Sequence, residues 1–390
     1  MAHPLRDRAA IVGIGATEFS KDSGRTELRL ACEAVTAALA EAGLEPAEVD
    51  GMVTFAMDST DEVEIARATG IGELTFFSRV PHGGGAACGT VGQAAMAVAA
   101  GVAGVVVCYR ALNGRSWQRF GAGVQGLRAA PTADRVHFGW YAPFGLLTPA
   151  HWVAMFARRA MHERGYTSED FGRVAVACRR HAATNPAAWF HGRPSTLADH
   201  QASPPIVEPL RLLDCCQESD GAVAIVVTSV ERSRELRQPA AVIRAVAQGA
   251  GAEQEVMTSF YRPEITGLPE MGLVARQLWS MAGIGPEDVQ TAVLYDHFTP
   301  FVLTQLEELG FCRRGEAADL VRAGGLELGG RLPVNTNGGQ LGEAYVHGMN
   351  GISEAVRQVR GTSVNQVPGV EHVLVTAGTG VPTSGLILGR

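Results

Sequence analysis

Three short stretches of this chain carry side chains that could do chemistry, and each lies beside a turn or strand end. The first, Gly83-Gly-Gly-Ala-Ala-Cys88, places a cysteine after a glycine turn and at the start of an alanine-rich helical pattern. A cysteine at a helix N-terminus meets the positive end of the helix dipole, which lowers the pKa of its thiol and favours the nucleophilic thiolate. A buried cysteine that packs as a weak hydrophobe fits the pattern equally well, so both interpretations stay open.

The second stretch, residues 333–351, reads PVNTNGGQLGEAYVHGMNG. Two asparagines surround a glycine pair, and the pattern predicts a glycine-rich turn and helix from Gly338 to Gly361. Tyr345 and His347 are expected one to two turns into that element, and both side chain types can act as general acids or bases. A helix cap followed by ordinary surface polar residues is the alternative.

The third stretch, Tyr295-Asp296-His297, follows the apolar run Thr291–Leu294. The run is typical of a buried strand, so the three titratable side chains are expected at its carboxyl end. Ligands of open α/β sheets bind at that end of the strands. A helix entry capped around Asp296–Thr299 is the alternative.

Other familiar sites are not supported by the sequence. Gly13-Ile-Gly15 lacks a third glycine and an acidic residue at the spacing of a dinucleotide-binding turn. Cys215-Cys216 has no second cysteine pair at metal-ligand spacing, so we expect no metal. No phosphate-binding P-loop and no Gly-x-Ser-x-Gly motif are present.

Composition excludes further classes of protein. The 390 residues carry a formal net charge of −7, which is unlike a nucleic-acid-binding protein. The first eight residues show no apolar segment typical of a secretion signal, and no apolar run is long enough to predict a membrane span. The seven scattered cysteines fit reduced thiols, so we expect a cytoplasmic protein.

An internal repeat indicates how these stretches are positioned. Segments 41–55 and 281–295 align at an offset of 240 residues, each after a helical pattern and before an apolar run that ends in an aromatic. Chance similarity between alanine- and glycine-rich segments is the weaker explanation. The identities are Ala42 with Ala282, Gly43 with Gly283, Pro46 with Pro286, Val49 with Val289 and Val53 with Val293.

The repeat predicts an α/β protein made of two β-α-β-α-β halves. We expect the first half at residues 1–235 and the second at 236–390. Residues 111–205 or thereabouts interrupt the pattern and form an inserted loop domain over the active site. Helices are expected in it at 150–164 and 168–185.

These features together resemble the thiolase superfamily over essentially the whole chain. Asn335-Thr-Asn-Gly-Gly matches the Asn-x-Asn-Gly-Gly turn of that family, and Leu212–Ala222 (LLDCCQESDGA) resembles a signature of its sterol-carrier or lipid-transfer branch. The closest likeness is to the thiolase-like aldolases of bacterial steroid side-chain degradation. The resemblance implies the thiolase fold, a layered α/β/α/β/α sandwich.

Within the resemblance, four positions decide the chemistry. Cys88 matches the thiolase nucleophile, whereas Tyr345 stands where a thiolase has the histidine of Gly-His-Pro. Tyr295 stands where thiolases have the asparagine of Asn-Glu-Ala-Phe, and Ala377 replaces the second cysteine. An unperturbed tyrosine has a pKa near ~10 and activates a thiol poorly. Acyl-enzyme chemistry therefore lacks its partners.

A retro-aldol cleavage needs only an acid, a base and donors that stabilise an enolate. The resemblance thus implies a lyase that cleaves a β-hydroxyacyl-CoA with a bulky steroid group into a ketone and propionyl-CoA. Tyr295 and Tyr345 are the expected acid/base pair, without an assignment of which is which. Cys88 shapes the pocket, and His297 and His347 tune the tyrosines.

The resemblance also implies binding residues and partners. Coenzyme A enters as part of the substrate, with no separate cofactor, and the expected substrate-binding residues are Asn337, Gly338, Gly339 and Gly378. A homodimer is expected, together with a small OB-fold (acyl-CoA-associated) protein bound to or fused with an enoyl-CoA hydratase. A thiolase-type acyltransferase that uses Cys88 and a non-catalytic acyl-CoA or lipid carrier stay open as alternatives.

Overall fold

The computed structural model describes residues 3–117, 119, 139–255, 257 and 259–390. Most of the chain is therefore placed in detail. The predicted insertion at 111–205 is described only in part, because 118 and 120–138 lie outside the described residues. The arginines at 128 and 135 in that segment are outside the description as well.

The N-terminal half contributes five strands in the order β3-β2-β4-β7-β1. β2 pairs with β3 and β4 in parallel, whereas β7 pairs antiparallel with both β4 and β1. The strands are β1 (Ala9–Ala16), β2 (Gly51–Phe55), β3 (Phe76–Val80), β4 (Val105–Asn113) and β7 (Asp220–Ser229).

The C-terminal half repeats this topology. β9 pairs parallel with β10, and β11 pairs antiparallel with both β10 and β8, while a parallel bridge from Ala292 to Val334 takes the place of β3. A short pairing of β1 with β8 joins the halves into one nine-stranded sheet among the described residues. The strands are β8 (Ala241–Gly249), β9 (Thr291–Val293), β10 (His372–Ala377) and β11 (Thr383–Gly389).

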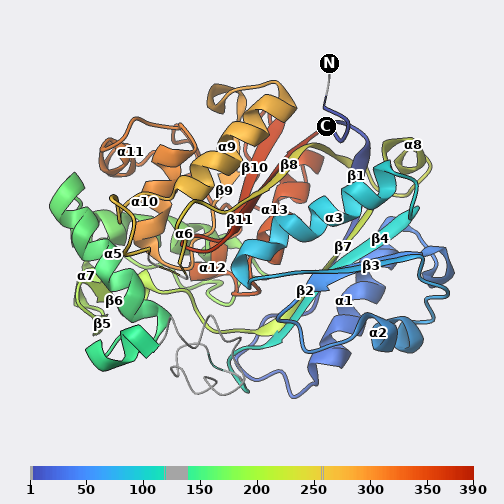
Figure 1. Ribbon diagram of the computed structural model, residues 1–390, viewed down its shortest axis with the longest axis horizontal. Helices are drawn as coiled ribbons and strands as arrows, with labels where there is room; N and C mark the ends of the chain where they lie inside the picture. Colours follow the sequence, from blue (N-terminus) through green and yellow to red (C-terminus); the bar gives the residue numbers. More distant parts are fainter. Residues whose placement is uncertain (1–2, 118, 120–138, 256, 258) are drawn as a thin grey trace.

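Helices form three layers around the two half-sheets, as Figure 1 shows. α1 (Glu27–Ala42) packs on the outer face of β1, β4 and β7, and α9 (Pro269–Ala282) packs on β8 and β11. α3 (Ala87–Ala99) and α13 (Met349–Arg360) lie between the half-sheets and contact strands of both. This layering confirms the predicted α/β/α/β/α architecture.

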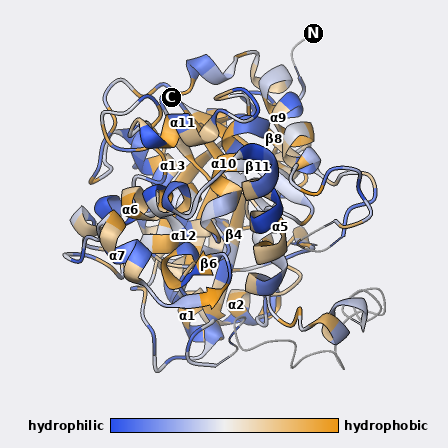
Figure 2. Ribbon diagram, turned by 90° about the vertical axis from the view of Figure 1, so that its left-hand side faces the viewer, coloured by the Kyte–Doolittle hydropathy of each residue, from blue (hydrophilic) through white to orange (hydrophobic). Residues whose placement is uncertain are grey.

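The sheet of the N-terminal half has one apolar core on each face, because successive residues of a strand point to opposite sides. On β1, Ile11 faces the central layer of α3 and α13, whereas Val12 faces α1. Neighbouring side chains point to opposite faces of a strand, so a strand buried on both sides reads as a continuous apolar run. Figure 2 shows the apolar residues concentrated in the interior of the molecule.

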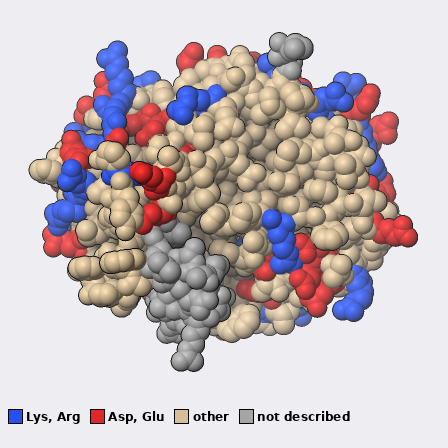
Figure 3. All heavy atoms as spheres, in the orientation of Figure 1, with Lys and Arg blue, Asp and Glu red and all other residues tan. Residues whose placement is uncertain are grey.

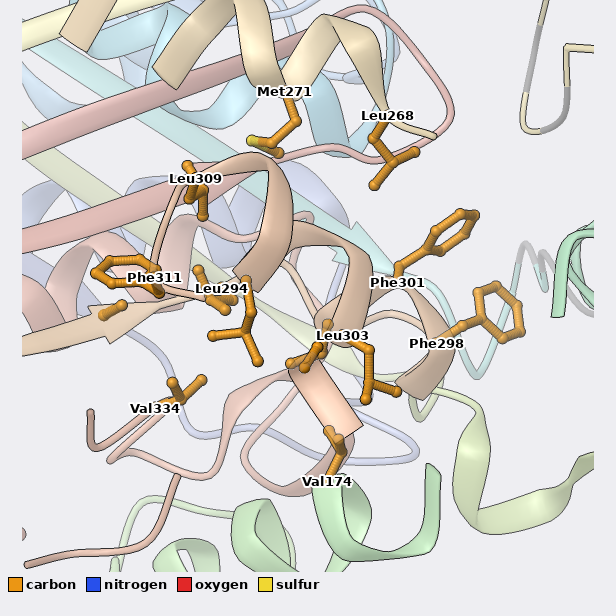
Figure 4. Packing of buried hydrophobic residues seen from close by; sticks show 14 of the residues in the cluster. Val174, Leu268, Met271, Leu294, Phe298, Phe301, Leu303, Leu309, Phe311 and Val334 are labelled. Atoms are coloured by element: carbon orange, nitrogen blue, oxygen red, sulfur yellow. The ribbon is translucent and has the colours of Figure 1, made fainter. Parts of the chain in front are cut away.

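The inserted helices pack on the C-terminal half rather than on the half that carries them in sequence. α5 (Pro149–Arg164) and α6 (Ser168–Thr184) confirm the two predicted helices, and α6 contacts α10, α11 and α12. Figure 4 shows Val174 of α6 beside Leu303 of α10 in this core. The remaining helices are α2 (Glu62–Thr69), α7 (Leu197–Ala202), α8 (Val230–Ser233), α10 (Thr299–Glu308), α11 (Ala317–Arg322) and α12 (Gly339–Gly342), and the short strands are β5 (Pro205–Val207) and β6 (Leu210–Arg211).

The helix predicted from Gly338 to Gly361 is wrong in its middle. α12 ends at Gly342 and α13 begins at Met349, so Tyr345 and His347 lie in an irregular link between two helices. His347 and Gly348 both adopt positive φ angles, 50° and 86°, which a right-handed helix does not allow. The link is what brings both side chains to the end of β9.

Two further observations concern the whole description. Among the described residues, no helix is long and apolar enough to cross a membrane. All seven cysteines are described, and each is a free thiol.

Candidate active site

Tyr295 is fixed at the carboxyl end of β9 by a clamp on its backbone. Its N–H donates to Oγ1 of Thr376 at 2.9 Å, and its carbonyl accepts from Nε2 of Gln305 at 2.8 Å. Thr376 in turn donates to Oε1 of Gln305 at 2.6 Å, and both side chains are buried. The sequence reasoning missed Gln305 and Thr376, because 81 residues separate Tyr295 from Thr376 and no local motif links them.

Tyr345 reaches the same place from the α12–α13 link. Its N–H donates to Oγ of Ser219 at 3.1 Å, which ties the link to the segment before β7. Its phenolic oxygen lies 3.4 Å from that of Tyr295, which is a long and weak hydrogen bond from the Tyr295 hydroxyl to that of Tyr345. The structure therefore brings together the two tyrosines that the sequence singled out.

A glycine turn makes room for the Tyr295 side chain. A Cβ atom on Gly84 would lie 1.8 Å from the phenolic oxygen of Tyr295, and one on Gly348 would lie 3.2 Å from its ring. Only residues without side chains allow so close an approach. Gly85 of the same turn packs against Gly378, whose own Cβ would lie 2.5 Å from the Cα of Gly85.

Both tyrosines are neutral phenols at rest, because their surroundings raise the pKa of each hydroxyl. Burial raises the pKa of Tyr295 well above its usual range, and the neighbouring Tyr345 adds to the rise. Burial also raises the pKa of Tyr345, but the hydrogen bond from Tyr295 and the charge of Arg110 oppose this increase. The Tyr295 hydroxyl donates the hydrogen bond between the two phenols, and Tyr345 accepts it.

The two predicted histidines flank the pair. The His297 ring lies 4.9 Å from the Tyr295 ring, and its Nδ1 lies 3.2 Å from Oγ1 of Thr379. The His347 ring lies 5.1 Å from the Tyr345 ring. Burial lowers the pKa of His297 to about 3 and that of His347 well below its usual value, so neither carries charge near neutral pH.

A buried ion pair stands behind His347, and the sequence reasoning missed it. Arg110 donates from Nε to Nδ1 of His347 at 3.1 Å and from Nη1 to Oδ2 of Asp58 at 2.7 Å. Both charged side chains are almost fully buried. Arg110 lies on β4 and Asp58 just after β2, so only the pairing of these strands could have revealed the contact.

Cys88 is the second residue of α3 and is fully buried in the central layer. Its Sγ lies 3.8 Å from the carbonyl oxygen of Val375. Burial raises the pKa of the Cys88 thiol, which favours the packing interpretation over a thiolate stabilised by the helix dipole. Desolvation of the charged form outweighs the dipole, and the structure supports the packing interpretation.

The predicted substrate-binding residues Asn337, Gly338 and Gly339 form a buried turn that packs against Asp296, the residue after Tyr295. Asn337 donates to Oε2 of Glu343, while a Cβ on Gly339 would lie 2.1 Å from Oδ2 of Asp296. These contacts hold the turn, and the role of the three residues toward the substrate stays a prediction. The same is true of Gly378.

Two buried carboxyl groups complete the surroundings. Asp296 accepts hydrogen bonds from the N–H groups of Gln340 and Leu341, yet burial raises its pKa to about 6. Burial likewise raises the pKa of Glu343 to about 7, although Asn350 donates to it. Within the described part of the chain, no group of three or more histidine, cysteine, aspartate or glutamate side chains is arranged to hold a metal ion.

Residues 249–390 match the family described as thiolase C-terminal domain-like. The whole chain is 69% identical over 385 residues to the steroid side-chain-cleaving aldolase of Thermomonospora curvata, covering 99% of this chain and 98% of the relative. It is 66% identical over 385 residues to the 17-hydroxy-3-oxo-4-pregnene-20-carboxyl-CoA lyase of Mycobacterium tuberculosis, covering 99% of this chain and 100% of the relative.

Solved structures give the same result. The fold superimposes on the structure titled Ltp2-ChsH2(DUF35) aldolase with a TM-score of 0.96 and 67% sequence identity, over 100% of this chain and 99% of that chain. A human mitochondrial 3-ketoacyl-CoA thiolase shares the fold with a TM-score of 0.69, but only 15% of its residues are identical.

Proposed function

The chain belongs to the steroid side-chain-cleaving aldolases of the thiolase superfamily, and we propose that it cleaves a steroid β-hydroxyacyl-CoA by a retro-aldol reaction at Tyr295 and Tyr345. The substrate name carried by the mycobacterial relative defines a suitable molecule. It has a hydroxyl on carbon 17 and a thioester on the carboxyl attached to carbon 20. Cleavage of the bond between carbons 17 and 20 of this molecule yields a 17-ketone and propionyl-CoA.

The observation that carries the proposal is the 3.4 Å separation of the two phenolic oxygens. In the cleavage, the β-hydroxyl loses its proton, its oxygen becomes a ketone, and the electron pair of the broken C–C bond forms a thioester enolate. The α-carbon of the enolate then takes one proton. One proton therefore moves from oxygen to carbon, and two adjacent neutral phenols can pass it along without gain or loss.

The hydrogen bond between the phenols supports one direction for this relay, because the Tyr295 hydroxyl donates it to Tyr345. Tyr295 then takes the proton of the β-hydroxyl while it gives its own proton to Tyr345. Tyr345 in turn gives its proton to the α-carbon, and the hydrogen bond from Tyr295 and the charge of Arg110 favour its loss of that proton.

The buried Cys88 thiol argues against the acyltransferase alternative. Thioester exchange needs a thiolate, and burial raises the pKa of this thiol, whose hydrogen-bond partners among the described residues are the Val375 carbonyl and Ser384, neither of them a base. Coenzyme A is part of the substrate in this proposal, and no separate cofactor is required. A cytoplasmic location stays a prediction.

We further propose a homodimer through β3 and α3. β3 is one of the two edge strands of the described sheet, and the side chains of Phe77 on β3 and Met96 on α3 are exposed by 67% and 41%. Figure 3 shows a broad area without charged side chains over the region where Figure 1 places α3, whereas charged side chains lie near β3, on which Arg79 pairs with Asp61 and Glu62. An apolar face beside an open strand edge is suited to pairing with a second copy.

A partner protein is also part of the proposal. The name of the superimposed structure, Ltp2-ChsH2(DUF35) aldolase, includes a DUF35 component beside the aldolase. We expect a small OB-fold protein of this kind, bound to or fused with an enoyl-CoA hydratase. The hydratase would supply the β-hydroxyacyl-CoA by adding water to an enoyl-CoA. Copurification of the two proteins tests the association.

The activity test uses the purified chain with its DUF35 partner and the 17-hydroxy steroid thioester. We expect equal amounts of propionyl-CoA and the steroid 17-ketone by liquid chromatography and mass spectrometry. The matched substrate without the 17-hydroxyl should not be cleaved, because it has no proton to start the reaction. Free coenzyme A with an acyl-protein adduct, instead of the two products, would contradict the proposal.

A further inference from the structure

Arg110 is an unusual neighbour for a histidine near an active site. Its Nε–H points at Nδ1 of His347 from 3.1 Å, and both side chains are only 2% exposed. Arginine keeps all its hydrogens at any pH at which proteins fold, so Nε is always a donor. Nδ1 of His347 must therefore accept, which leaves the ring hydrogen on Nε2.

Asp58 holds Arg110 in this position. Oδ2 of Asp58 accepts from Nη1 of Arg110 and from the N–H of Ala111, and Oδ1 accepts from the N–H of Thr60. Phe55 lies beside both partners, stacked on the His347 ring at 5.9 Å and under the Arg110 guanidinium at 5.5 Å. Arg110 of β4 and Phe55 of β2 thus hold the imidazole of His347 in one orientation.

His347 occupies this position in a conformation that residues with side chains rarely adopt. Its φ of 50° lies in the left-handed region, which turns the ring from the α12–α13 link back toward β4. The ring edge with Cε1 and Nε2 faces Gly83, since a Cβ there would lie 3.1 Å from both atoms. The next residue, Gly84, contacts the hydroxyl of Tyr295, so Nε2 and that hydroxyl border the same turn.

We propose that Arg110 is a positioning residue for the retro-aldol reaction: it holds His347 neutral, with its hydrogen on Nε2, as a donor to the thioester enolate. This inference rests on the proposed function. Stabilisation of the developing enolate oxygen is the largest single contribution expected in such a reaction, and a neutral imidazole N–H is a suitable donor. A protonated His347 would instead direct an Nδ1–H at the Arg110 cation.

The ionisable groups around His347 either oppose its protonation or carry no charge. Arg110 faces it from β4, while His297 in the segment after β9 and Tyr345 beside it are neutral near pH 7. The carboxylate of Asp58 is engaged by Arg110. Burial acts in the same direction, so His347 stays neutral through the whole physiological range.

The test is a histidine side-chain nitrogen–proton correlation spectrum of the full chain, with His347→Gln used to identify the signals. Wild type should show a hydrogen on Nε2 and none on Nδ1, with no change between pH 5.5 and 8.5. Arg110→Gln should give a mixture of ring forms, with the hydrogen on Nδ1 in part of the molecules, because a glutamine amide can accept as well as donate a hydrogen bond. A wild-type signal that titrates, or a hydrogen on Nδ1, overturns the proposal.

Kinetics separate this inference from the proposed function. The kcat of Arg110→Gln should fall roughly 10²-fold, as expected when a group at the reacting centre is misplaced. Arg164→Gln removes another buried ion pair, with Glu307, and controls for a general loss of stability. If Arg164→Gln loses as much activity, and His347 in Arg110→Gln keeps its hydrogen on Nε2, Arg110 is only structural. If wild type does not cleave the steroid thioester, the proposed function fails while the spectrum still decides the ring form.

Discussion

A methyl group on Gly84 would lie 1.8 Å from the phenolic oxygen of Tyr295, closer than any two unbonded heavy atoms can approach. The glycine turn before α3 and the tyrosine after β9 therefore fit together only because Gly84 has no side chain. This contact defines the position of the Tyr295 hydroxyl and leads to the first prediction.

Gly84→Ala should reduce cleavage at least ~10²-fold, because the Tyr295 hydroxyl must move away from Tyr345. The matched control is Gly72→Ala, since a Cβ at Gly72 meets nothing within 4 Å. Steady-state rates with the steroid thioester and thermal unfolding of both variants check this. A fully active Gly84→Ala protein would show that the observed tyrosine position is not needed.

Tyr295→Phe and Tyr345→Phe should each lower kcat by ~10² to 10⁴, the range for loss of an acid or a base. Each substitution keeps the backbone hydrogen bonds of the two residues to Thr376, Gln305 and Ser219, so folding should be retained. The rates would be measured with both products quantified. A loss of less than tenfold in either variant would remove that tyrosine from the mechanism.

Cleavage in deuterated water distinguishes the roles of the two tyrosines. Wild type should place deuterium on carbon 2 of propionyl-CoA in one configuration. The slow residual product of Tyr295→Phe should keep that configuration, because Tyr345 still protonates the carbon. Tyr345→Phe should give a mixture, since solvent then supplies the proton. The opposite pattern would reverse the assignment.

Cys88→Ala should retain cleavage within roughly tenfold of wild type, well above the level expected after loss of an acid or base. Cys88 is buried with a raised thiol pKa and serves packing in this interpretation. Intact-protein mass spectrometry after incubation with propionyl-CoA should show no adduct in either protein. An adduct present in wild type and absent in Cys88→Ala would favour acyl transfer.

Glu343 should make the protein less stable as pH rises. Its pKa is about 7 in the folded protein against an ordinary value of 4.5, so the folded state binds more protons between these values. Its contribution is fully present below about pH 4.5 and is lost as pH rises to about 7. Each pH unit inside that window corresponds to ~1.4 kcal/mol.

Glu343→Gln tests this linkage through the free energy of unfolding at pH 5 and pH 8. The variant should compare more favourably with wild type at pH 8 than at pH 5, whatever its absolute stability. Asp199→Asn is a control, because Asp199 is an exposed carboxylate whose pKa is lowered by its helix-cap hydrogen bonds to Thr196. An unchanged difference between the two pH values for Glu343→Gln would contradict the raised pKa.

The sequence by itself determined the architecture. The offset of 240 residues between the repeated segments reappears as α1 ending at Ala42 and α9 ending at Ala282, and as β2 beginning at residue 51 and β9 at 291. Such features are local, because helices and strands follow the period of their apolar residues. The Asn335-Thr-Asn-Gly-Gly turn and the two tyrosines were likewise readable from residue types and spacing.

Only the tertiary structure decided what surrounds those tyrosines. The predicted helix through Tyr345 is interrupted at His347, Cys88 is too deeply buried to be a ready thiolate, and Arg110 meets His347 across 237 residues of sequence. Each of these depends on strands and helices that pack side by side although they are distant in the chain. Burial, and with it the pKa of a side chain, is set by that packing and not by sequence neighbours.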